Sequence, residues 1–167
     1  MAAQDAIGRK GRLRGCMLGL AIGDALGAPA EHLCWGEIRE RFGKAGVTDL
    51  EAWRDLPAGS ITDDTQMSLA TATGLIEAMR EISDGSPFNS IPAVWCSYLA
   101  WHDMQCSPEN RRDPGLTCLT ALAGGQMGTI EHPANDSKGC GGVMRVAPAG
   151  LAFAPEEAFR QATTFAA

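Results

Sequence analysis

The chain has 167 residues, 45% of them hydrophobic, which is the size and composition of one globular domain, residues 1–167, with its own core. Its formal net charge is -6 and its isoelectric point is near 5.0. We therefore expect no nucleic acid or membrane surface as the main partner, because both attract basic patches. No segment has the length of a membrane span, and the N-terminus lacks a signal-peptide pattern, which favours the cytoplasm.

The first expected element is a helix over residues 5–26, where no proline occurs and apolar residues recur every three or four positions. Glycine also recurs at every fourth position from Gly11 to Gly27, at a cost of about 1 kcal/mol each relative to alanine in a helix. This pattern predicts that another helix packs closely against the glycine stripe. Asp24 lies on the apolar face of the helix, as a buried acid with partners or at the edge of a polar site.

The first helix is expected to end near Ala28, because Pro29 disfavours a helical conformation in the residue before it. Glu31 then lies just past the helix end. Residues 43–60 mix glycine, proline and polar residues, which predicts a long irregular connection. Loops of that length often border functional sites.

Three oxygen-bearing side chains, Thr62, Asp63 and Asp64, stand directly before the next expected helix, residues 65–82. A hydroxyl and two carboxylates suit a hard cation such as magnesium or manganese. They are also typical of a helix N-cap, where acids complement the helix dipole, and the segment by itself favours capping. The inward face of this helix is expected to carry the apolar residues Leu69, Ala72, Ile76 and Met79.

Further helices are expected over residues 91–105, 115–123 and from residue 155 onward, and no segment shows the alternation of a strand. The aromatic residues of the first of these are assigned to the core. The sequence thus predicts an all-α domain of about six helices. The cysteines fit no disulfide or zinc pattern and are expected to be free and buried: Cys16, Cys34, Cys96, Cys106, Cys118 and Cys140.

A glycine-rich segment, residues 137–145, precedes an apolar run. Backbone N–H groups in such a turn can hold phosphate oxygens, and Lys138 or Arg145 could add positive charge. The segment fits neither the P-loop nor the dinucleotide-binding fingerprint, and by itself it slightly favours a flexible surface loop.

Three segments together resemble the ADP-ribosylglycohydrolase family: GCMLGLAIGDALGAPAE (residues 15–31), TDDTQM (residues 62–67) and SKGCGGVMR (residues 137–145). The three motifs occur in the family's order at plausible spacing, and the resemblance spans essentially the whole chain. It implies a compact orthogonal all-α fold and hydrolysis of the bond between ADP-ribose and a protein side chain. It also implies two divalent cations, magnesium or manganese, and an ADP-ribosylated protein or an ADP-ribose-containing small molecule as the partner.

The resemblance assigns roles to individual positions. Thr62, Asp63 and Asp64 would bind metal, and Glu31 would be the catalytic residue, an acidic side chain near the scissile ribose. Asp113 belongs to a looser match with another active-site loop. The remaining residues expected to bind substrate are Asp24, Lys138, Gly139, Cys140, Gly141, Gly142 and Met144.

The family's C-terminal aspartate-rich motif does not follow Arg145 in this sequence. We therefore expect the N-terminal portion of such an enzyme, truncated or completed by a second chain or by self-association. An alternative function is that of an inactive module that binds ADP-ribose or a partner. A third is a helical structural domain in which the motifs serve only capping and packing.

Overall fold

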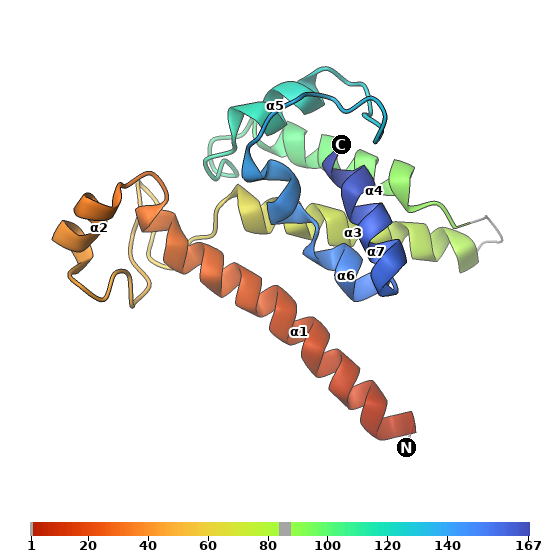
Figure 1. The fold of residues 1–167 in the computed structure, drawn as a ribbon, viewed down its shortest axis with the longest axis horizontal. Coiled ribbons are helices and arrows are strands. Elements are labelled where there is room, and N and C mark those ends of the chain that lie inside the picture. The colour runs from red at the N-terminus through yellow and green to blue at the C-terminus, as the bar shows by residue number, and fades with distance from the viewer. Residues whose placement is uncertain (1, 84–87) are drawn as a thin grey trace. The chain divides into compact units, whose positions relative to one another are not determined.

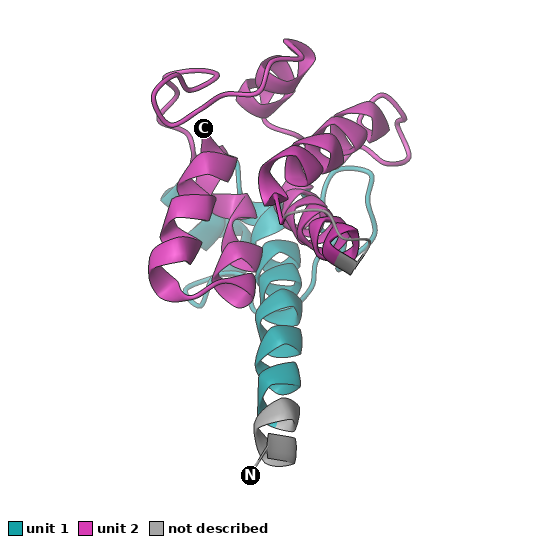
Figure 2. Cartoon of the chain, turned by 90° about the vertical axis from the view of Figure 1, so that its right-hand side faces the viewer, with its two compact units in different colours: residues 1–62 teal, residues 63–167 magenta. Residues whose placement is uncertain are grey.

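The computed structural model describes residues 2–83 and 88–167, in which every regular element is helical (Figure 1). The chain divides into two compact units, residues 1–62 and residues 63–167 (Figure 2). Among the described residues, the only strand-like feature is an isolated bridge between Trp53 and Leu56. The predicted all-α class is therefore confirmed.

The first unit contains α1 (Ala2–Gly27), a short 3-10 helix η1 (Ala28–Ala30) and α2 (Trp35–Phe42). The first helix and its end match the prediction. The second helix was not predicted. It is capped by Glu37, whose carboxylate accepts the Cys34 N–H at 2.7 Å. A glutamate three residues after the N-cap is a capping signal, but cysteine in place of serine or threonine conceals it.

The glycine stripe of α1 does not form the predicted helix crossing within the first unit. Apart from the backbone of α1 itself, a Cβ atom placed on any stripe member meets no atom of the first unit within 4 Å: Gly11, Gly15, Gly19, Gly23 and Gly27. These glycines are exposed. Small-residue spacing permits a close approach between helices, but it does not provide the helix that approaches.

The second unit contains five α-helices and a 3-10 helix: α3 (Asp63–Ser83), α4 (Ser90–Met104), α5 (Leu116–Ala123), η2 (Cys140–Arg145), α6 (Ala147–Ala152) and α7 (Pro155–Ala166). Helix α3 packs along α4, and α7 contacts both α4 and α6. The core is made of Met67, Leu75, Val94, Tyr98, Trp101, Cys118, Leu122, Ala149 and Phe165. The prediction that aromatic residues of α4 lie in the core is confirmed.

The helices of this unit begin where the sequence provides capping groups. The Asn89 side chain accepts the Ile91 N–H at 3.3 Å and caps α4. Helix α7 begins at Pro155, with Glu156 and Glu157 in its first turn. The described residues form seven α-helices, where about six were expected, and the sequence analysis gave no range for two of them, α2 and α6.

The inward face of α3 differs from the predicted one. Leu69 and Ile76 are about half exposed, at 49% and 50%, and Met79 is exposed as well. The buried face instead carries Met67, Ser68, Thr71, Leu75 and Ala78. Hydropathy selected the wrong face because the side toward α4 uses small and hydroxyl-bearing residues. Their polar groups are satisfied there: the Thr71 and Tyr98 hydroxyls lie 2.8 Å apart, within hydrogen-bond distance.

All six cysteines are free, as predicted, but most are not buried. Only Cys118 is buried, Cys16 is half-buried, and the other four are exposed: Cys34, Cys96, Cys106 and Cys140. Burial raises the pKa of the Cys118 thiol, although the nearby Arg145 guanidinium opposes that effect. Among the described helices, none is long and apolar enough to cross a membrane.

Candidate functional site

In the first unit, Asp24 anchors the residue that precedes α3. Its carboxylate accepts the Thr62 backbone N–H at 2.9 Å and the Thr62 hydroxyl at 2.7 Å. Thr62 is 2% exposed, so this contact satisfies a buried polar residue across 38 positions of sequence. The Thr62 hydroxyl donates a hydrogen bond to Asp24. Its oxygen can therefore serve any further group only as a hydrogen-bond acceptor or as a metal ligand.

The predicted irregular connection, residues 43–60, has no helix and only one isolated bridge, and its end is held in place. The Trp53 indole N–H donates to the Ser60 carbonyl at 3.0 Å, and the Trp53 side chain is buried. The Ser60 hydroxyl donates to the Pro57 carbonyl at 2.7 Å. These two hydrogen bonds fix the end of the loop, which directly precedes Thr62 and its contact with Asp24.

Glu31 lies one residue past η1, where the sequence placed it. Its backbone N–H donates to the Ala28 carbonyl at 3.4 Å, and the residue is exposed. Ala28 and Pro29 are buried beneath this turn and fix its backbone. The carboxylate therefore projects from an anchored turn that follows the Asp24 end of α1.

In the second unit, Asp63 joins the start of α3 to a loop, residues 105–115. Its backbone N–H donates to the Arg112 carbonyl at 2.9 Å, and its carboxylate accepts the Gly115 N–H at 3.3 Å. Asp63 is 4% exposed, and Asp64 beside it is half-buried. Two acids in the first turn of a 21-residue helix also interact favourably with the helix dipole.

The loop that contacts Asp63 carries Asp113, the weakest of the predicted substrate-binding residues. Asp113 has a left-handed backbone, with φ of 59°, and is half-buried beside the buried Pro114. A non-glycine residue in this region carries backbone strain that the surroundings must maintain, and such positions cluster at functional sites. Asp113 lies between Arg112 and Gly115, the two residues of this loop that contact Asp63 at the start of α3.

Gln66 is a positioning residue to which the sequence analysis assigned no role of its own. Its side chain donates to the Asn110 carbonyl at 2.8 Å. Its amide oxygen accepts from the Trp101 indole at 3.2 Å and from the Gln105 amide at 3.1 Å. The loop that contacts Asp63 is thereby tied to α4 through one side chain. The signal in the sequence was the position of Gln66, inside the second family motif.

The glycine-rich segment has a packing role that the sequence did not reveal. A Cβ atom on Gly141 would lie 2.7 Å from the Cys118 sulfur, and one on Gly142 would lie 2.8 Å from the Ala166 Cβ. The Met144 carbonyl accepts the Ser68 hydroxyl at 2.7 Å, which attaches η2 to α3. The predicted phosphate-binding residues Lys138, Gly139 and Cys140 are exposed.

Arg145, considered as a phosphate ligand, is occupied by structural contacts. Its guanidinium donates to the Phe165 carbonyl at 3.0 and 3.1 Å and lies over the Tyr98 ring at 5.0 Å. It thereby holds the last turn of α7, where carbonyl groups lack helical partners. Burial raises the pKa of the Tyr98 hydroxyl, and Arg145 partly offsets this rise.

We expect Asp24→Ala to lower the free energy of unfolding of the first unit by about 1 to 3 kcal/mol, because it removes a charged acceptor from two buried Thr62 donors. Urea unfolding followed by circular dichroism would measure the change. Asp49→Ala, which removes an exposed carboxylate from the same unit, serves as the control. Equal effects of the two substitutions would show that the Asp24 contact does not hold the loop.

The all-α fold agrees with that of a known class of protein. The ADP-ribosylglycohydrolase family model matches residues 5–167, so the chain belongs to the ADP-ribosylglycohydrolase family. It is similar to the ADP-ribosyl-[dinitrogen reductase] glycohydrolase of Rhodospirillum rubrum, with 35% identity over 143 residues, or 84% of this chain and 44% of that protein. An Archaeoglobus fulgidus protein described as uncharacterized is 32% identical over 142 residues, or 85% of this chain and 43% of its own length. The chain spans less than half the length of these relatives.

Proposed function

We propose that this chain provides one side of a metal-dependent active site that hydrolyses the glycosidic bond between ADP-ribose and a protein side chain. The observation that carries the proposal is the setting of Asp63. This buried acid begins α3 and is bonded to the loop that holds Asp113 in a left-handed conformation. Membership of the family supports the reaction class.

The residues at the start of α3 fit a hard divalent cation. Thr62, Asp63 and Asp64 provide only oxygen donors, the ligands that magnesium and manganese prefer. We assign these three residues as ligands of a pair of such ions. Bound there, the ions would supply Lewis-acid polarisation of ribose or diphosphate oxygens. Asp24 orients the Thr62 hydroxyl, because its carboxylate oxygen accepts a hydrogen bond from the hydroxyl oxygen at 2.7 Å.

The other residues bind substrate or act on it. Glu31, on its anchored turn, would accept the proton of the attacking water and stabilise positive charge at the anomeric carbon. Asp113 and the segment from Lys138 to Met144 would bind the ADP-ribose moiety. The attachment of Met144 to Ser68 brings that segment against the same helix that begins with Asp63.

The direct test is release of ADP-ribose from an ADP-ribosylated protein by the 167-residue chain with magnesium. We expect release that a chelator abolishes and that Glu31→Gln reduces by at least about 100-fold, as for loss of a general acid or base. Glu40→Gln, which changes an exposed carboxylate on α2, should leave the rate of ADP-ribose release unchanged.

Stabilisation by ADP-ribose without release would instead favour the inactive binding module, because a ligand that binds only the folded state raises the melting temperature. If neither magnesium nor ADP-ribose shifted the melting temperature, the proposed function would be wrong.

The proposal includes a second chain or second copy that packs on exposed apolar residues of α3 such as Leu69 and Ile76. Sedimentation velocity of the assayed sample would detect that association.

A further inference from the structure

Two cysteines of the second unit lie near each other where α5 packs against η2. Cys118, on α5, is 7% exposed. A Cβ atom on Gly141 would lie 2.7 Å from its sulfur, and the Arg145 guanidinium donates to the same sulfur at 3.7 Å. Cys140, which begins η2 directly before Gly141, is exposed. The buried sulfur of Cys118 therefore contacts the residue next to an accessible thiol.

The distance between these cysteines can be closed by a small movement. Consecutive Cα atoms are about 3.8 Å apart, so the Cys118 sulfur lies within about 8 Å of the Cys140 Cα atom. Burial raises the pKa of the Cys118 thiol, Arg145 opposes this rise, and the charge of Cys140 adds to it, so the two thiols lie within range of each other's charge. A disulfide needs Cα atoms about 4.4 to 6.8 Å apart, so one segment must shift by a few ångströms.

Cys140 is the cysteine whose segment can shift. It follows residues 124–139, which form no helix or strand, whereas Cys118 lies within α5 and belongs to the core. The side-chain hydrogen bonds that hold η2 join its other end, at Met144 and Arg145. The first residue of η2 can therefore approach α5 while those attachments stay in place.

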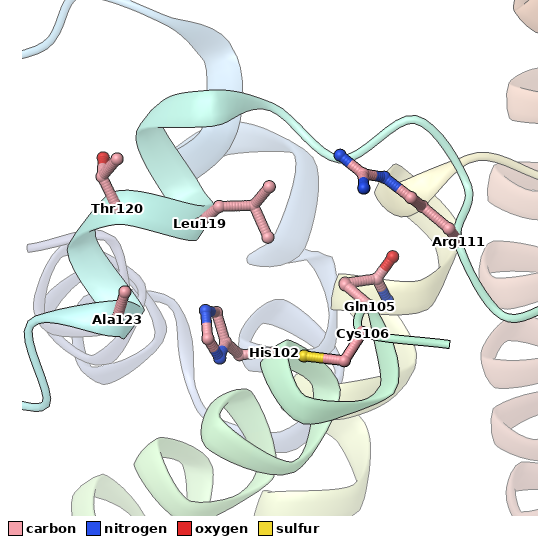
Figure 3. A pocket seen from close by; sticks show the side chains of 7 residues that line it. All are labelled: His102, Gln105, Cys106, Arg111, Leu119, Thr120 and Ala123. Carbon is pink, nitrogen blue, oxygen red and sulfur yellow. The ribbon is translucent and has the colours of Figure 1, made fainter. Parts of the chain in front are cut away.

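Cys106 is the competing exposed thiol near α5. It lines a cavity of about 340 Å³ between the end of α4 and α5 (Figure 3). Cys118 does not line this cavity, because its sulfur faces η2. The residues of α5 that do line it are Leu119, Thr120 and Ala123. Cys106 therefore approaches a different face of α5, and Cys140 is the better placed partner for Cys118.

We propose that a peroxide oxidises the exposed Cys140 thiol and that Cys118 then forms a reversible disulfide with it. In the first step the Cys140 sulfur takes one oxygen atom from hydrogen peroxide, which gives a sulfenic acid and one water molecule. In the second step the Cys118 sulfur attacks the sulfenic acid sulfur and the S–O bond breaks. The departing hydroxyl takes the Cys118 proton and leaves as a second water molecule. Hydrogen peroxide is thus the two-electron oxidant of the two thiols.

The disulfide would act on the segment that the proposed function assigns to ADP-ribose, and this consequence rests on that function. The bond would tie the first residue of η2 to α5 and remove the free thiol of Cys140. We expect oxidation to weaken ADP-ribose binding at least about tenfold, within the usual range of coupling between two sites, and dithiothreitol to restore it.

Peptide mapping of the 167-residue chain after treatment with hydrogen peroxide tests the linkage. Remaining thiols are alkylated and the chain is digested with trypsin without reduction. Peptide 113–138 then carries only Cys118, and peptide 139–145 carries only Cys140. We expect these two peptides to be joined and dithiothreitol to separate them. At about 1 µM protein this bridge should exceed cross-links between chains at least about tenfold, because neighbouring thiols of one chain meet at an effective concentration of about millimolar.

Serine variants separate the two steps. Cys118→Ser should leave a sulfenic acid at position 140 that dimedone traps, and Cys140→Ser should abolish the bridge. Cys96→Ser, which removes an exposed thiol of α4, is the matched control and should leave the yield of the bridge unchanged. Circular dichroism checks that each variant is folded.

Three results would overturn the proposal: sulfinic acid at Cys140 without a bridge, a bridge from Cys140 to a different cysteine, or no oxidation of either thiol. A bridge that leaves ADP-ribose binding unchanged would refute the consequence for the substrate segment. A bridge in a chain that binds no ADP-ribose in either redox state would establish the disulfide and count against the proposed function.

Discussion

Gly74→Ala should destabilise the second unit by about 1 to 3 kcal/mol, although alanine is the better helix former by about 1 kcal/mol. A Cβ atom at Gly74 would lie 2.4 Å from the Val94 Cα atom, 2.7 Å from the Val94 nitrogen and 2.8 Å from the Ala93 carbonyl oxygen. All three atoms belong to the backbone of α4, so no side-chain rotation relieves the overlap. Helices α3 and α4 would have to move apart around a packed core.

The same substitution in α1 is the matched control. Gly15→Ala adds a methyl group that meets no atom of the first unit within 4 Å outside its own helix, so it should stabilise that helix by up to about 1 kcal/mol. Urea unfolding gives the two changes in free energy, and hydrogen exchange locates the loss in α3 and α4. A stabilising or neutral effect of Gly74→Ala would contradict the close helix crossing.

Asp63→Asn and Asp64→Ala should each abolish detectable binding of magnesium or manganese while preserving the helical fold. Losing groups that merely support metal ligands costs about 10- to 100-fold in affinity, so losing a ligand should cost at least about 100-fold. Asparagine at position 63 keeps an oxygen that can accept the Gly115 N–H, which separates the loss of charge from the loss of the loop contact.

Calorimetry with manganese measures the affinity, and circular dichroism checks the helices. Glu77→Gln is the control, because Glu77 is an exposed carboxylate on the same helix, paired with Arg80 at 2.6 Å. Manganese affinity that survives either aspartate substitution would remove that residue from the metal site and restore the capping interpretation of the segment.

Much of the fold followed from local sequence signals. The helices now numbered α1, α3, α4, α5 and α7 were placed within about three residues, because apolar periodicity, prolines and capping residues act over one or two turns. Helix α2 was missed because its N-cap is Cys34 rather than serine or threonine. The buried face of α3 was misassigned because Ser68 and Thr71 have low hydropathy but find partners inside the unit.

For the candidate site too, the sequence indicated some features and not others. The positions of Glu31, Thr62, Asp63, Asp64 and Asp113 were predicted from motifs, and their proposed roles stay predictions. The bond between Asp24 and Thr62 joins residues 38 positions apart, and that between Asp63 and Gly115 joins residues 52 positions apart. No local signal indicates such pairs, because loop closure over these lengths is set by the packing of the whole unit.

The sequence by itself determined the all-α class, most helix boundaries and membership of the family, because each depends on residue order within short segments. Tertiary structure alone decided which glycines matter. Within the first unit, the regular stripe of α1 meets no atom within 4 Å apart from its own helix, whereas in the second unit the single Gly74 allows α4 to approach. It also decided which polar groups are satisfied, as in the contacts of Gln66, and which are not, as for the Gln105 side-chain oxygen, which has no partner among the described residues. Burial and hydrogen bonding are properties of neighbours in space, which the spacing of residues along the chain does not determine.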